Sequence, residues 1–148
     1  MRIAYVSLHW ARTKNSGVGK KIQNQIETWR RMGHESRLFM HASIGEPAGP
    51  LIEAEVIPYE ARGKIRTEFN RIRAARQLVQ AVEAFKPDII YLRYGIYVYP
   101  AHRLMQVAPV VEEINTNDLT QHDDLGGMYS LYNRFTRGIF LRLVRGLV

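Results

Sequence analysis

Two glycines near the start of the chain are placed where a backbone can meet a phosphate. Gly17 and Gly19 come after an apolar run over 2–8 and directly before residues with helical periodicity. Glycine lets the backbone approach a ligand closely, and the N–H groups at a helix start favour negative charge by roughly 0.3–1 kcal/mol. The pair therefore indicates an anion-binding turn, although the same glycines also suit a turn that holds no ligand.

Other polar side chains follow the ends of apolar runs. Arg93 and Tyr94 come directly after one such run, Glu113 and Asn115 lie at the end of the next, and His9 follows the first. A guanidinium there can hold a phosphate, a carboxylate can orient hydroxyl groups, and an amide can hydrogen-bond them but cannot take a proton near neutral pH. The alternative for Arg93 and Glu113 is an ion pair with each other.

The apolar pattern divides the chain into alternating strands and helices. Short continuous apolar runs are typical of strands covered on both faces, and apolar residues three or four apart are typical of helices. Pro58 is expected to end the third strand, and the helix at 64–85 is expected to begin its apolar stripe at Ile65 and Phe69 and to expose most of its arginines. We predict strands at 2–8, 36–42, 55–57, 89–92 and 109–114, and helices at 18–32, 64–85, 99–107 and 129–148.

This order predicts an α/β fold, a Rossmann-like parallel sheet of about five strands with helices on both faces. Ligands of such sheets bind at the carboxyl ends of the strands, near the point where the strand order reverses, which we expect beside the first strand. The last predicted helix has no capping signal and no strand after it. Residues 1–148 are therefore expected to form a single domain that is the first half of a longer protein.

The composition fits a globular domain with an excess of positive charge. The 148 residues are 46% apolar and 24% charged, and 21 Lys and Arg against 14 Asp and Glu give a net charge of +7. Such a balance favours phosphates, anionic headgroups or nucleic acid as partners, but a solvated helix face accounts for it equally well. Between 62 and 76 one acid, Glu68, stands against Arg62, Lys64, Arg66, Arg71, Arg73 and Arg76.

Several kinds of protein and site are disfavoured. No apolar run approaches the roughly 20 residues of a membrane span, and the first residues lack a signal-peptide pattern, so a cytoplasmic protein is expected. The absence of cysteine excludes disulfides and thiolate metal sites. Ile22 stands where a dinucleotide fingerprint needs a third small residue, and no P-loop sequence occurs. A polar loop, with no metal, is the favoured interpretation of Asp118, His122, Asp123 and Asp124.

Five segments of the chain carry a joint likeness to a known family. They are MRIAYV at 1–6, SGVG at 16–19, RRMGHE at 30–35, KPDIIYLRYG at 86–95 and PVVEEIN at 109–115. Taken in this order they resemble the N-terminal domain of glycosyltransferase family 4. Each motif alone is degenerate, but the five together are fairly specific and cover nearly the whole chain.

The resemblance implies a GT-B fold, in which two Rossmann-like domains face each other across a cleft. It also implies retaining transfer of a sugar from a nucleotide sugar to a sugar or lipid-linked acceptor, with no metal or other cofactor. The family often has a histidine where this chain has Asn115, and some members resemble the Glu113-Ile-Asn115 pattern. The candidate site then consists of Gly17 and Gly19 for the donor diphosphate, Glu113 and Asn115 as catalytic residues, and His9, Arg93 and Tyr94 on the acceptor side.

In that family the principal donor-binding residues belong to a C-terminal domain, which this chain does not contain. The chain alone is therefore expected to bind donor poorly and to have little or no activity. The basic helix at 62–76 is expected to face an anionic membrane, with no specific nucleic acid as partner, because no nucleic-acid motif accompanies the arginines. The alternative is a stand-alone Rossmann-like or flavodoxin-like binding module for a phosphorylated, nucleic-acid or membrane-surface ligand.

Overall fold

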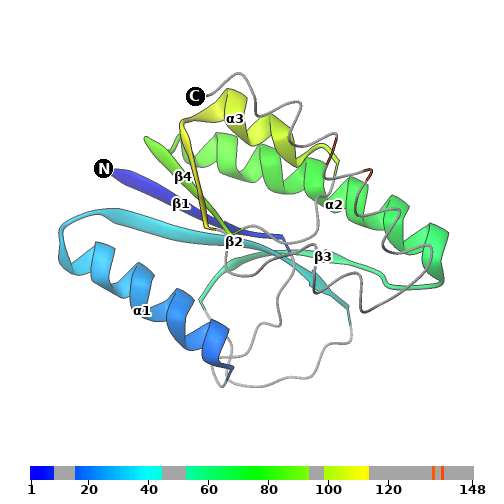
Figure 1. Cartoon of the computed structure of the whole chain (residues 1–148), viewed down its shortest axis with the longest axis horizontal. Coiled ribbons are helices and arrows are strands. Elements are labelled where there is room, and N and C mark those ends of the chain that lie inside the picture. The colour runs from blue at the N-terminus through cyan, green and yellow to red at the C-terminus, as the bar shows by residue number, and fades with distance from the viewer. Residues whose placement is uncertain (9–15, 45–52, 94–98, 114–134, 136–137, 139–148) are drawn as a thin grey trace.

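The computed structural model describes residues 1–8, 16–44, 53–93 and 99–113, together with Phe135 and Gly138. Over these residues the chain forms a five-stranded, all-parallel sheet with helices on both faces, as predicted (Figure 1). The strands are β1 (Arg2–Ser7), β2 (Glu35–Ser43), β3 (Glu55–Tyr59), β4 (Ile89–Arg93) and β5 (Val110–Glu113). The helices are α1 (Gly17–Arg31), α2 (Lys64–Phe85), the 3₁₀ turn η1 (Ala101–Arg103) and α3 (Leu104–Val107).

The strand order is β3-β2-β1-β4-β5, so β1 lies at the centre of the sheet. In its two ladders Ile3 of β1 lies opposite Ser36 of β2 and Ile89 of β4. The chain adds β2 and β3 on one side of β1 and then crosses to the other side for β4 and β5. The order of strands therefore reverses between β1 and β4, and the carboxyl ends of these two strands are where such a fold holds a ligand.

Alternate residues of β1 pack into two different cores. Val6 belongs to a core with Leu78 and Val82 of α2, whereas Tyr5 belongs to a core with Ile22 of α1. Figure 1 shows the corresponding layers, with α1 on one face of the sheet and α2 and α3 on the other. A shift of β1 by one residue would exchange these faces, so the two cores fix the register of the central strand.

Two boundaries differ from the predictions. Pro58 does not end the third strand, because β3 continues to Tyr59. β3 is an edge strand, and an edge tolerates proline since no further strand needs its missing N–H. The predicted helix at 99–107 is instead η1 followed by the single turn of α3. The predicted helix at 129–148 lies outside the described residues apart from Phe135 and Gly138.

The first half of α2 faces solvent with its apolar side chains, contrary to the prediction. Ile65 and Phe69 are 76% and 67% exposed, whereas Arg71 is buried, with its Nη1 donating to Oε1 of Glu68 at 2.8 Å. Periodicity locates a stripe on a helix but does not tell which turns overlap the sheet. The stripe contacts the core only in the second half of α2, through Ala74, Ala75, Leu78, Val79, Val82 and Phe85.

Candidate functional site

Glu113, the last residue of β5, is the centre of a polar cluster at the carboxyl edge of the sheet. Its Oε2 accepts a hydrogen bond from the Tyr5 hydroxyl at 3.0 Å, and its Oε1 accepts one from Nη1 of Arg93 at 3.1 Å. The ammonium group of Lys21 donates to the same Oε1. The four residues come from β5, β1, β4 and α1, so the cluster joins four elements at the point where the strand order reverses.

The sheet register explains why these side chains meet. Ser7 of β1 lies opposite Arg93 of β4, and Arg93 lies opposite Glu113 of β5. Register neighbours in a parallel sheet project from the same face, and Tyr5 shares that face because it is two residues before Ser7. Tyr5 packs in the core beneath α1, so this is the α1 face. Lys21 joins the cluster from α1, the helix that covers this face of the sheet.

The cluster holds two cations against one carboxylate. The side chains of Arg93 and Glu113 are only 4% and 7% exposed, whereas that of Lys21 is 54% exposed. Burial raises the pKa of Tyr5, so its hydroxyl stays protonated and remains a donor to Glu113. Glu113 is therefore a fixed acceptor that holds Arg93 and Lys21 in place, and Lys21 is the cation that solvent or a ligand can reach.

The first turn of α1 lies next to this cluster along the chain, one turn before Lys21. Ser16 caps the helix, and its Oγ accepts from the Gly19 N–H at 2.9 Å. The N–H groups of Gly17 and Val18 precede the first intrahelical bonds, so they have no partner within the helix. Gly17 is exposed, and a Cβ built on it would meet no other described residue within 4 Å, its chain neighbours and its own helix backbone aside. The turn therefore presents donors and open space at its first residue.

Of the predicted site residues, the structure brings Arg93 and Glu113 together, in the ion pair that the sequence left open as an alternative. Gly17 and Gly19 lie in the first turn of α1, as expected. His9, Tyr94 and Asn115 lie outside the described residues.

Three residues of this edge were not predicted, namely Tyr5, Ser7 and Lys21. Ser7 is fully buried, and its Oγ has no hydrogen-bond partner among the described residues. The available signal for Tyr5 and Ser7 was a pair of hydroxyls two residues apart in an otherwise apolar strand, which places both on one face. Lys21 carried no such signal, because its partner is 92 residues away in sequence.

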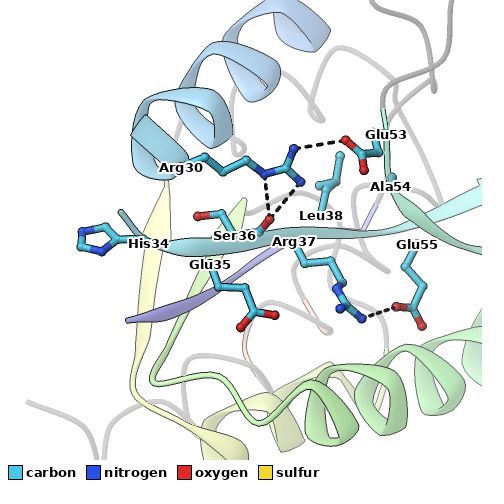
Figure 2. Close-up of a pocket in the computed structure, with 9 residues that line it drawn as sticks. All are labelled: Arg30, His34, Glu35, Ser36, Arg37, Leu38, Glu53, Ala54 and Glu55. Atoms are coloured by element: carbon cyan, nitrogen blue, oxygen red, sulfur yellow. Dashed lines mark hydrogen bonds and ion pairs between the residues drawn. The ribbon is translucent and has the colours of Figure 1, made fainter. Parts of the chain in front are cut away.

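A hollow of about 540 Å³ lies at the opposite edge, where β2 and β3 begin (Figure 2). Figure 2 shows Arg30 reaching from α1 across β2 to Glu53, where Nη1 and Oε2 are 3.1 Å apart. Nη1 of Arg37 lies 3.6 Å from Oε2 of Glu55, and both residues line the same hollow. These ion pairs tie the segments around β3 to the rest of the sheet, and we assign this hollow a structural role.

Neither the other features of the described residues nor comparison with known proteins identifies a family for this chain. No group of three or more potential metal ligands occurs among the described residues, and Asp118, His122, Asp123 and Asp124 lie outside them. Within the described part of the chain no helix is long and apolar enough to cross a membrane. No protein-family model matches the chain, and no curated protein is significantly similar to it.

Proposed function

We propose that this chain supplies one wall of the active site of a retaining, nucleotide-sugar-dependent glycosyltransferase, and that its carboxyl edge meets the donor diphosphate. The observation that carries the proposal is the position of Lys21 and Arg93. Both converge on Glu113 at the switch point of the sheet, one helical turn from the glycine-bearing start of α1. The likeness to the glycosyltransferase N-terminal domain supports the same assignment.

The charges at this edge suit a leaving diphosphate. The cations Lys21 and Arg93 and the carboxylate of Glu113 lie beside N–H groups at the α1 start that have no partner within the helix, and such N–H groups favour negative charge. In glycosyl transfer the bond between the sugar and the diphosphate breaks, and negative charge grows on the phosphate oxygens. Positive groups that are already in position stabilise that charge without reorganisation.

Within this proposal Glu113 is a positioning residue. Its oxygens receive donors from Tyr5, Lys21 and Arg93, which keeps both cations at the edge. Contact with sugar hydroxyls remains the prediction for Asn115, and a place on the acceptor side remains the prediction for His9 and Tyr94. The remaining wall of the cleft is assigned to a donor-binding domain.

The experiment is an NMR titration of the ¹⁵N-labelled chain with uridine and guanosine diphosphates, with uridine as the phosphate-free control. Weak binding is expected, with the largest shifts at the amides of Gly17 and Lys21. Lys21→Ala should weaken it roughly fivefold, as for an exposed charge worth about 1 kcal/mol. The matched control is Lys20→Ala, which removes an exposed neighbouring lysine and should leave binding unchanged.

Gly17→Val tests the open space at the start of α1. Among the described residues a Cβ at this position has open space, so the fold should persist while the valine occupies the proposed position of the phosphate. When the chain is assayed with its donor-binding domain, this variant should raise the donor KM or reduce kcat. Unchanged kinetics, or titration shifts that avoid the α1 start, would contradict the diphosphate role.

The alternative, a stand-alone binding module, predicts a different outcome. Inorganic pyrophosphate would then bind as tightly as the nucleoside diphosphates, and the chain assayed with a donor-binding domain would transfer no sugar.

A further inference from the structure

One face of α2 combines exposed apolar side chains with arginines. Ile65 and Phe69 are 76% and 67% exposed and lie four residues apart, so they are neighbours on the same side of the helix. Helical spacings of three, four and seven residues place Arg66, Arg73 and Arg76 around them, and Arg62 lies just before the start of the helix. We call this set of six residues the α2 outer face. Arg71 does not belong to it, because its side chain is buried beside Glu68.

The positive charge of this face is largely uncompensated within the described part of the chain. Arg66 lies 3.6 Å from Glu60, and both side chains are mostly in solvent, so this pair is weak. The guanidinium groups of Arg62, Arg73 and Arg76 form no ion pair or hydrogen bond with any described residue. The face therefore combines two large apolar groups with an excess of positive charge.

A groove of about 320 Å³ continues the face between α2 and η1. Arg76 from α2 and Arg103 from η1 line it together with the carboxylate of Glu83, and the amides of Gln80 and Gln106 supply further donors. The guanidinium group of Arg103, like that of Arg76, has no ion-pair partner among the described residues. Two guanidinium groups that converge on one hollow are suited to a phosphate, because each offers a fork of N–H donors.

We infer that the α2 outer face docks on a bilayer containing anionic phospholipids, with Ile65 and Phe69 entering the interface and the groove between Arg76 and Arg103 holding a headgroup phosphate. A soluble phosphate ligand would account for the arginines but not for the exposed phenylalanine. An apolar protein partner would account for Phe69 but not for the arginines around it. A membrane interface accounts for both, because it offers negative charge at its surface and hydrocarbon just beneath. This inference is independent of the sugar-transfer proposal.

The test is co-sedimentation of the chain with vesicles of phosphatidylcholine containing about one-third phosphatidylglycerol, compared with vesicles of phosphatidylcholine alone. The chain should bind the anionic vesicles preferentially. The double variant Ile65→Ser with Phe69→Ser should lower the partition coefficient about tenfold or more, because the apolar insertion is lost. Met32→Ser is the matched control, since Met32, the C-cap residue of α1, is 66% exposed and should be replaceable without effect.

The arginines are tested by Arg73→Gln with Arg76→Gln, which should lower the partition coefficient about fivefold for each charge removed. Arg31→Gln, an exposed arginine of α1, is the matched control. Circular dichroism must show that all variants remain folded, and these surface changes are expected to do so.

Three results would overturn the inference. The first is vesicle binding that is unchanged in the serine double variant. The second is a dimer, present without vesicles, that the same variant dissociates, because the face would then serve a second copy of the chain. The third is saturable binding of glycerol phosphate that depends on Arg76 and Arg103 without any binding to vesicles, which would identify a soluble anion as the ligand.

Discussion

Tyr5 shows how one buried hydroxyl links the core to the candidate site. Its ring packs against Tyr91, with centroids 5.2 Å apart, while its hydroxyl donates to Glu113. Burial raises the pKa of this phenol above its ordinary value of 10.0. The proton that the folded protein retains at alkaline pH is therefore one that the unfolded chain releases.

This difference predicts a pH-dependent loss of stability. Well below pH 10.0 Tyr5 is protonated in both states and contributes no slope. As the pH rises above that value the unfolded chain binds fewer protons, so the free energy of unfolding should fall, by at most about 1.4 kcal/mol per pH unit from this residue. Urea unfolding between about pH 8 and 11 measures the slope.

Tyr5→Phe should reduce the alkaline slope, because no phenol is then held protonated in the core. Tyr91→Phe is the control, since it alters the same ring cluster without removing the bond to Glu113. Parallel slopes for the wild type and Tyr5→Phe would contradict this account.

At the scale of elements, α2 divides into two halves with different roles. The second half buries apolar residues from Ala74 to Phe85 against the sheet, whereas the first half exposes Ile65 and Phe69 and buries Arg71. Nη1 of Arg71 pairs with Glu68, but its Nε and Nη2 have no hydrogen-bond partner among the described residues. A buried charge with incomplete partners costs stability that an apolar side chain of similar size does not.

We therefore expect Arg71→Met to leave the free energy of unfolding unchanged or to raise it, by up to about 4 kcal/mol. Glu68→Ala should have the opposite sign and cost about 2 kcal/mol, because it removes the ion-pair partner of the buried guanidinium. Arg73→Met is the control on the exposed side of α2 and should change stability by less than about 0.5 kcal/mol. Urea denaturation measures all three, and a large loss in Arg71→Met would show that Arg71 is well satisfied.

The periodicity of the sequence predicted α2 well and its surroundings less well. The bounds at 64–85 agree with the structure because the helical pattern and the break before Pro87 are local. The inward direction of Ile65 was wrong because it depends on how far the helix overlaps the sheet, which is a tertiary property. The predicted strand end at Pro58 was wrong for a similar reason, since a proline is tolerated there only because β3 is an edge strand.

At the scale of the whole molecule, Glu113 connects elements that are distant in sequence. From β5 it holds Tyr5 of β1, Arg93 of β4 and Lys21 of α1. These contacts link β5 to β1, β4 and α1 at the carboxyl edge of the sheet. The guanidinium group of Arg93 is almost fully buried, and its ion pair with Glu113 is one of the interactions that compensate its charge.

Glu113→Ala should therefore lower the free energy of unfolding by about 3–5 kcal/mol, the typical cost of breaking a buried ion pair by removing one of its members. Glu53→Ala removes another carboxylate that pairs with an arginine, but its side chain is 77% exposed, so the loss should stay below about 1 kcal/mol. Thermal or urea unfolding compares the two. Equal losses would mean that Glu113 is not the organiser of this edge.

The sequence by itself determined the local elements and the fold class, because apolar period, glycine and proline act over a few residues. It also placed Gly17, Arg93 and Glu113 at the ends of elements where parallel sheets bind ligands. Tertiary structure decided the strand order, the burial of Arg71, the exposure of Phe69 and the choice of Lys21 and Tyr5 as partners of Glu113. Those outcomes depend on which residues far apart in the chain come within a few ångströms, and no local pattern encodes that distance.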